Sequence, residues 1–225
     1  MTLLVTAFEK FGPWAHNHTV DIAEALAAEL GADALTLPVD LLSAPSLLRA
    51  RLASSPPSAL LSLGLHGRAK AMRVERAALN VADFRIPDNA GRSASGPLIP
   101  GAPDGLLTSV DVRALVEEVR AADVPADVSN SAGTYLCNAI FYFGLTEVRR
   151  LGIPGLFVHV PPVPGAAVEA AERLAAMRAA GKLPAGPPRH LTGEDGGVDQ
   201  DVGLPLDQQI RAVFVVARHL LRAAG

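Results

Sequence analysis

The order of strand-like and helix-like segments is the feature of this sequence that most narrows its possible folds. Five short apolar runs have the length and composition of buried β-strands. Longer stretches between them place apolar residues at helical spacing. A chain that alternates in this way buries its strands between helices, so a mainly parallel, twisted sheet is predicted. The five runs cover residues 3–8, 34–39, 59–65, 125–130 and 155–161.

The helix-like stretches predict helices that cover both faces of this sheet. The first helix can be capped by Thr19, a residue type that favours helix N-termini, and can end at Gly31. The expected fold class is therefore α/β, a three-layer α/β/α sandwich. The predicted helices span residues 19–30, 42–54, 110–122, 134–150, 165–180 and 206–223.

Three further segments depart from the regular alternation. Residues 72–84 alternate like a strand, and we expect them to form a longer, partly antiparallel excursion. Segments 85–105 and 181–203 are dense in Gly and Pro and are predicted to be loops, the first functional and the second mobile. No shift in composition marks a domain boundary, and 49% hydrophobic residues suffice for a large core. Residues 1–225 are therefore expected to form a single domain.

Charge and cysteine content argue against several classes of protein. A formal net charge of -3, with Lys and Arg spread thinly, provides no basic stripe for nucleic acid. The apolar run at residues 2–8 is too short for a membrane span and lacks signal-peptide features, so a cytoplasmic protein is expected. A single cysteine makes no internal disulfide and no thiolate-rich zinc site. His16 and His18 lack cysteine or carboxylate partners in their loop and are expected to face solvent rather than bind metal.

That single cysteine, Cys137, follows the run at 125–130 and stands at the start of a predicted helix. If Thr134 caps this helix, Cys137 is its third residue, where the macrodipole and the backbone N–H groups stabilise a thiolate. Position alone nevertheless favours an inert, buried cysteine.

His159 and Glu75 are two further candidates for chemistry. His159 lies in an apolar strand that Pro161 and Pro162 stop just beyond it, which places it near the same sheet edge as Cys137. Glu75 is a charge in an apolar alternating segment, and a buried carboxylate needs a partner. The alternatives are a core histidine at position 159, and at position 75 a surface glutamate or one that forms a salt bridge with a nearby Arg. Together, the three residue types meet the requirement of a thiol hydrolase, in which His accepts the thiol proton and an acid orients the imidazole.

Four blocks of the sequence, taken together, are more specific than any one motif. They are VTAFEKFG (5–12) followed by Asn17-His18-Thr19, VERAALN with DFRIPDNAG (74–91), VSNSAGTYLCN (128–138) and FVHVPPVP (157–164). In order and spacing, over most of the chain, they resemble the type I pyroglutamyl peptidases, or pyrrolidone carboxyl peptidases.

The resemblance implies a role for each candidate residue. The family's nucleophile falls on Cys137, its general acid and base on His159, and its third triad member on Glu75. Arg85 falls near the oxyanion region, and Asp88 beside it is expected to be structural. The residues that hold the pyroglutamyl ring fall on Phe8, Phe11, Ile86, Tyr135 and Leu136.

The resemblance also implies a three-layer α/β fold, assembly as a homotetramer, and no cofactor or metal. One departure concerns Leu65, which stands where many members have a glutamine that helps to hold the lactam. Because leucine cannot hydrogen-bond, we expect weaker substrate binding, by about 0.5–1.5 kcal/mol. Leu65→Gln would then lower the Michaelis constant.

The implied function is that of a cysteine exopeptidase. It would hydrolyse the amide bond after an N-terminal pyroglutamyl (5-oxoproline) residue of peptides and proteins, through an acyl-enzyme. Two alternatives stay open. Another thiol amidase on the same scaffold would keep Cys137 and His159 without needing Phe8 and Phe11, and a catalytically impaired homologue would only bind a small molecule.

Overall fold

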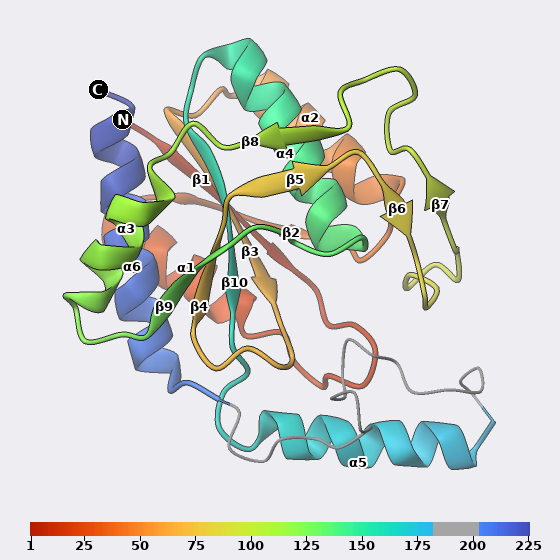
Figure 1. Ribbon diagram of the computed structural model, residues 1–225. Coiled ribbons are helices and arrows are strands. Elements are labelled where there is room, and N and C mark those ends of the chain that lie inside the picture. Colours follow the sequence, from red (N-terminus) through yellow and green to blue (C-terminus); the bar gives the residue numbers. More distant parts are fainter. Residues whose placement is uncertain (182–202) are drawn as a thin grey trace.

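The computed structural model describes residues 1–181 and 203–225, so most of the predicted mobile loop 181–203 lies outside the described residues. Within them, a six-stranded sheet with the order β2-β1-β3-β10-β4-β9 forms the middle layer (Figure 1). Its strands are β1 (Leu3–Phe8), β2 (Asp33–Leu37), β3 (Ala59–Leu65), β4 (Met72–Glu75), β9 (Ala126–Ser129) and β10 (Gly155–Val160).

Helices cover both faces of this sheet, which confirms the predicted three-layer α/β fold. One layer contains α1 (Thr19–Leu30), α3 (Val112–Arg120) and α6 (Leu206–Ala223). The other contains α2 (Ser43–Ser54) and α4 (Leu136–Leu151). Helix α5 (Ala166–Ala179) follows β10 and lies beyond the carboxyl end of that strand (Figure 1).

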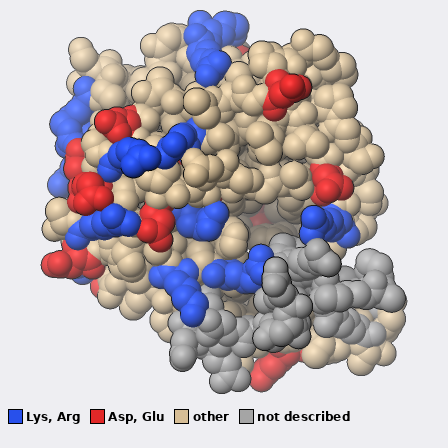
Figure 2. Space-filling model, in the orientation of Figure 1, with Lys and Arg blue, Asp and Glu red and all other residues tan. Residues whose placement is uncertain are grey.

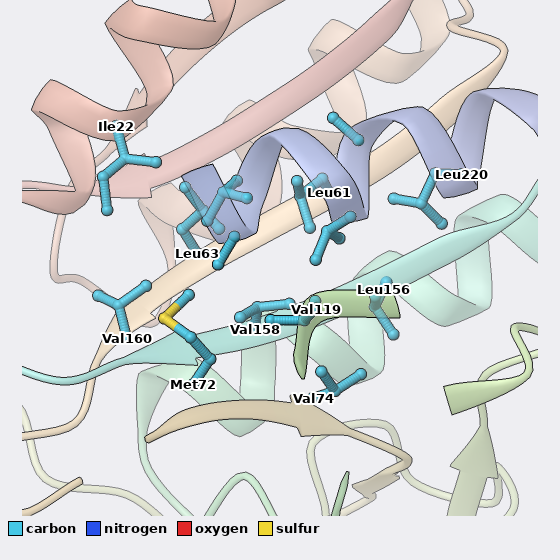
Figure 3. Packing of buried hydrophobic residues seen from close by; sticks show 14 of the residues in the cluster. Ile22, Leu61, Leu63, Met72, Val74, Val119, Leu156, Val158, Val160 and Leu220 are labelled. Carbon is cyan, nitrogen blue, oxygen red and sulfur yellow. The ribbon is translucent and has the colours of Figure 1, made fainter. Parts of the chain in front are cut away.

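The central strands β1, β3 and β10 are mostly apolar because both of their faces are buried. Successive side chains of a strand point to opposite faces. Leu61 and Leu63 of β3 and Val158 of β10 therefore pack against the α1, α3 and α6 layer (Figure 3). Their neighbours in sequence, Leu60 and Phe157, pack against the α2 and α4 layer.

The sheet is mixed rather than wholly parallel. Strands β1, β2, β3 and β10 are parallel to one another, whereas β4 is antiparallel to β10 and parallel to β9. The antiparallel excursion predicted for 72–84 is thereby confirmed. It continues into β5 (Ala77–Leu79), which pairs with β8 (Gly105–Leu107), and β6 (Ala82–Asp83), which pairs with β7 (Ser95–Gly96).

The direction of β9 corrects one step of the sequence argument. Because β9 is antiparallel to β10, their carboxyl ends lie at opposite edges of the sheet. The idea that Cys137 and His159 share an edge because both follow parallel strands is therefore wrong. Residues 130–135 instead lead from β9, across the positions of β4 and β10, to the start of α4.

A hydrogen bond connects the start of α1 to the end of β1. The helix begins at Thr19 with His18 as its N-cap residue, so Thr19 is not the cap that was predicted. The Thr19 hydroxyl instead donates to Oδ1 of Asn17 at 2.8 Å and accepts from the Phe8 N–H at 3.4 Å. Gly31 does end the helix, in the left-handed conformation at φ 63°.

The surface agrees with the modest net charge. On the face shown in Figure 2, Lys and Arg side chains are interspersed with Asp and Glu side chains. Such mixing differs from the single-sign stripe that binds a phosphate backbone. No helix within residues 1–181 and 203–225 is both long and apolar enough to cross a membrane.

Candidate active site

Cys137 is the second residue of α4, one position earlier than predicted. Tyr135, rather than Thr134, is the N-cap residue, and its side chain makes no capping hydrogen bond. Gly133 allows the turn before the helix, because its φ of 82° suits a residue without a Cβ. The first N–H groups of a helix have no partner inside the helix, so those beside Cys137 can bind an anion.

Gly64 provides the space that the thiol occupies. A Cβ atom on Gly64 would lie 3.0 Å from Sγ of Cys137 and 2.8 Å from Cζ of Phe157. Contacts that short require one of the groups to move, since packed interiors have no spare volume. A side chain at position 64 would therefore displace the thiol or the Phe157 ring.

Gly64→Ala is accordingly expected to lower kcat/KM by about 10- to 100-fold, because a displacement of about 1 Å at a reacting atom costs that much. The matched control is Gly144→Ala in α4, where the new Cβ would meet the flexible ends of two side chains, Leu60 at 3.1 Å and Leu48 at 4.0 Å. Steady-state kinetics on both variants checks this. Equal kcat/KM in the two variants would contradict the claim that the Cys137 thiol and the Phe157 ring leave no room for a side chain at position 64.

His159 forms a buried pair with Glu75. Nδ1 of His159 lies 2.8 Å from Oε1 of Glu75, and the side chains are 4% and 0% exposed. Burial lowers the pKa of His159, but the charge of Cys137, a hydrogen bond to Cys137, and the hydrogen bond and charge of Glu75 together raise it to about 9. Since Nδ1 is engaged by Glu75, Nε2 is the nitrogen that remains for Cys137.

Arg73 adds a positive charge beside Glu75, and it is the nearby arginine that the sequence offered as an alternative partner for this carboxylate. Its Nε lies 3.6 Å from Oε1 of Glu75, and its Nη2 donates to Oγ of Ser129 at 2.7 Å. Residues two apart on a strand face the same side, so the spacing of Arg73 and Glu75 is the signal that identifies which arginine it is. A nearby cation offsets part of the cost of burying a carboxylate.

The strand register arranges the site side chains in a row. His159 is paired with Gly64 on one side and with Arg73 on the other. The hydroxyl groups of Thr6 and Ser62 are hydrogen-bonded at 2.9 Å, so the residues two further along, Phe8 and Gly64, face the same layer. The thiol above Gly64 therefore lies between Phe8 and His159.

Four of the five predicted ring-binding residues belong to one apolar cluster. Phe8 and Leu136 are buried in it, and Phe11 and Tyr135 pack against it. The Tyr135 ring also packs against Phe84, with 4.4 Å between the ring centroids. The structure thus brings these side chains to the α4 side of the sheet, on which Cys137 also lies.

The fifth, Ile86, is half-buried in the loop that follows β6. A hydrogen bond connects this loop to the apolar cluster that contains Phe8 and Leu136. The hydroxyl of Tyr135, which packs against that cluster, donates to the Pro87 carbonyl at 3.1 Å. Asp88 is buried and accepts N–H bonds from Leu41 and Arg92 at 3.1 and 2.8 Å, which agrees with its predicted structural role.

Arg85 is exposed and makes no hydrogen bond or ion pair within the described part of the chain. Its role near the oxyanion stays a prediction. The backbone N–H groups at the start of α4 are the donors that the fold itself places at Cys137.

Asn138, next to the nucleophile, anchors the start of α4 and was not singled out from the sequence. Its Oδ1 accepts from the Leu79 N–H at 2.8 Å, and its Nδ2 donates to the Leu79 and Val81 carbonyls at 2.9 and 3.0 Å. A fully buried amide with three backbone partners holds Cys137 in register with β5. The partners lie some sixty residues earlier, so no local pattern around Asn138 indicates this role.

Asn138→Ala is expected to destabilise the fold by about 2 kcal/mol or more, because it leaves buried backbone groups of Leu79 and Val81 without partners. Asn89→Ala is the control, since Asn89 is exposed and water can replace its hydrogen bonds. Urea unfolding measures both. If Asn138→Ala lowers the free energy of unfolding by less than Asn89→Ala does, the anchoring role is contradicted.

Leu65 is buried in a small apolar cluster of its own. Leu65 is 4% exposed and packs in a small cluster with Trp14, Ala167 and Ala170, with Phe11 at its border. The effect of this leucine on substrate binding stays a prediction.

The prediction that both histidines face solvent is wrong for His18. It is 4% exposed, and its Nε2 lies 2.9 Å from the Pro161 carbonyl and 3.0 Å from Oε1 of Gln209. It thereby links the segment after β1 to the end of β10, and burial lowers its pKa. His16 is exposed and lies 2.7 Å from Asp21. Across residues 1–181 and 203–225, no three His, Cys, Asp or Glu side chains are grouped so as to hold a metal ion.

Known proteins are similar to this chain over more than two thirds of its length. A pyrrolidone-carboxylate peptidase of Clavibacter michiganensis subsp. michiganensis is 39% identical over 166 residues, which are 71% of this chain and 78% of the relative. One from Pyrococcus furiosus is 36% identical over 171 residues, or 73% and 82% of the two chains.

Solved structures show the same relationship over nearly the whole chain. A mutant pyrrolidone carboxyl peptidase from Pyrococcus furiosus has a TM-score of 0.81 and 28% identity, and covers 99% of both chains. The pyrrolidone carboxyl peptidase of Fervidobacterium islandicum AW-1 has a TM-score of 0.81 and 26% identity, also over 99% of both chains. The profile of the family described as pyroglutamyl peptidase matches residues 1–182. This chain therefore belongs to the pyroglutamyl peptidase family of cysteine peptidases, which remove N-terminal pyroglutamate.

Proposed function

We propose that this chain hydrolyses the amide bond after an N-terminal pyroglutamyl residue of peptides and proteins, with Cys137 as the nucleophile. His159 acts as general base and acid. Glu75 orients the imidazole ring of His159 and stabilises its protonated form. The observation that carries the assignment is the buried contact of 2.8 Å between His159 and Glu75, which leaves the second ring nitrogen for Cys137. A thiol, an imidazole and a carboxylate in this order form the relay that acyl transfer requires.

The reaction proceeds in two halves. His159 accepts the proton of the Cys137 thiol, Sγ attacks the pyroglutamyl carbonyl carbon, and N–H groups at the start of α4 stabilise the oxyanion. When the C–N bond breaks, Nε2–H of His159 gives its proton to the leaving amine, and a thioester remains on Cys137. Water then attacks the thioester while His159 accepts a proton from it, which releases pyroglutamate and restores the thiol.

Selectivity follows from the apolar cluster around the thiol. The pyroglutamyl lactam is uncharged, so it can enter the space beside Phe8 and Phe11 at little desolvation cost. An ordinary N-terminus carries a charged ammonium group, which would lose its hydration there without a partner. Blocked peptides are thus accepted and free N-termini are rejected.

Aminocoumarin amides of pyroglutamate, proline and glutamine test this function. We expect kcat/KM to be at least about 100-fold higher for the pyroglutamyl amide, because the others place a charged amine in the pocket. Iodoacetamide should abolish turnover. Comparable cleavage of the prolyl amide would indicate another thiol amidase, and binding without turnover would indicate an impaired homologue.

By resemblance, we further propose that the chain assembles as a homotetramer and acts in the cytoplasm without a cofactor. Arg85 would assist the oxyanion as a second donor near Cys137. Sedimentation equilibrium gives the assembled mass, and a monomer at micromolar concentration would contradict the first part.

A further inference from the structure

His66 lies next to the proposed acid and base and has no part in the mechanism above. It follows β3 directly, and its backbone N–H continues the pairing with β10 by donating to the Val160 carbonyl at 2.9 Å. Its ring lies edge-on to that of His159, with 5.4 Å between the centroids and 81° between the planes. His66 and Cys137 are both half-buried, so both can be reached from outside, whereas His159 is buried.

The His66 ring is neutral and presents a donor. Burial and the positive charges of His159, Arg73 and Arg68 lower the pKa of His66 to about 3. Nδ1 of the neutral ring accepts from the Arg68 backbone N–H at 3.4 Å, so the proton is on Nε2. Within the described part of the chain, no other residue accepts a hydrogen bond from that Nε2–H.

The row of site side chains shows which part of a substrate meets this donor. The thiol above Gly64 has Phe8 on one side and His159 on the other. The pyroglutamyl ring occupies the Phe8 side, so the leaving amine must lie on the His159 side, where it receives its proton. His66 contacts His159, which places it beside the residue that leaves.

We propose that His66 is a substrate-binding residue whose Nε2–H donates to the carbonyl oxygen of the residue after pyroglutamate. This inference rests on the function proposed above and extends it to the second residue of the substrate. A neutral donor suits the position, because a second cation there would oppose the protonated His159. The enzyme should therefore distinguish peptides, which have that carbonyl, from arylamides, which lack it.

The test compares a pyroglutamyl-alanyl peptide with pyroglutamyl-4-nitroanilide. His66→Phe keeps a ring against His159 but removes the donor, so kcat/KM should fall about 3- to 10-fold for the peptide and stay within about twofold for the anilide. His66→Gln restores an N–H donor and should recover part of the loss on the peptide. His219→Phe in α6, another half-buried histidine, is the control and should leave the ratio of the two substrates unchanged.

Two results would overturn the inference alone. Equal losses on both substrates would mean that His66 acts only through His159, and unchanged kinetics on both would mean that it contacts no substrate. The anilide activity of His66→Phe also shows that the variant is folded. A wild-type enzyme that cleaves neither substrate would instead overturn the proposed function, and the inference with it.

Discussion

Cys137→Ser is expected to lower kcat/KM on a pyroglutamyl amide by at least about 10³-fold. A serine hydroxyl is a far weaker nucleophile than a thiolate. His159, whose pKa is raised to about 9, carries the positive charge that such an anion needs. Steady-state kinetics at pH 7, with enough enzyme to detect a residual rate, measures the loss.

The chain has a single cysteine, which gives this experiment its control. Iodoacetamide should add one carboxamidomethyl group to the wild type and none to Cys137→Ser, and the added mass should track the loss of activity. The thermal midpoint should be nearly unchanged, since oxygen for sulfur is a small change at a half-buried position. Retention of more than about a tenth of the activity would contradict the assignment of the nucleophile.

The layered fold could be predicted because its periodicities are strong. The segments 19–30, 59–65 and 206–223 match α1, β3 and α6 without correction. Each helix must bury one apolar stripe, and each central strand must bury both faces, so the pattern of apolar residues directly reflects the layers.

Strand direction could not be predicted from the same pattern. A strand such as β9, which is only a few residues long, has the same apolar pattern in either direction. The sequence therefore led to a parallel β9 and to the wrong reason for the closeness of Cys137 and His159. Their closeness depends instead on the crossing segment 130–135 and on the absence of a side chain at Gly64.

The polar contacts around the site could not be predicted from local sequence patterns either, because their partners are distant in the sequence. The His18 ring contacts the Pro161 carbonyl 143 residues away, and the Asn138 amide bonds to Leu79 and Val81, which lie 59 and 57 residues earlier. Such pairs follow from tertiary packing, in which each buried polar group must find a partner. The triad roles came from the resemblance of four motifs, since spacing alone does not bring Glu75 to His159.

Glu75→Gln is expected to lower kcat by about 10²- to 10⁴-fold, the contribution of a well-placed general acid and base. Glutamine keeps the shape of the side chain but removes the negative charge 2.8 Å from Nδ1 of His159. His159 must be protonated when it donates to the leaving amine, and Glu75 is one of the causes that favour the protonated ring. The control is Glu118→Gln, which alters a similar pair, with His219 Nδ1 at 2.9 Å, between α3 and α6.

The pH dependence separates this role from a merely structural one. Burial lowers the pKa of His159, whereas Cys137 and Glu75 raise it to about 9 in the folded protein, above the ordinary value of 6.5. The protonated ring therefore adds stability that is complete below about pH 6.5 and is lost as the pH rises through about 9. Without the Glu75 charge the folded pKa of His159 falls, so the alkaline limb of kcat/KM should move to lower pH. In Glu118→Gln the alkaline limb should stay at the same pH as in the wild type. If Glu75→Gln lowers kcat but leaves the alkaline limb at its wild-type pH, Glu75 only supports the fold.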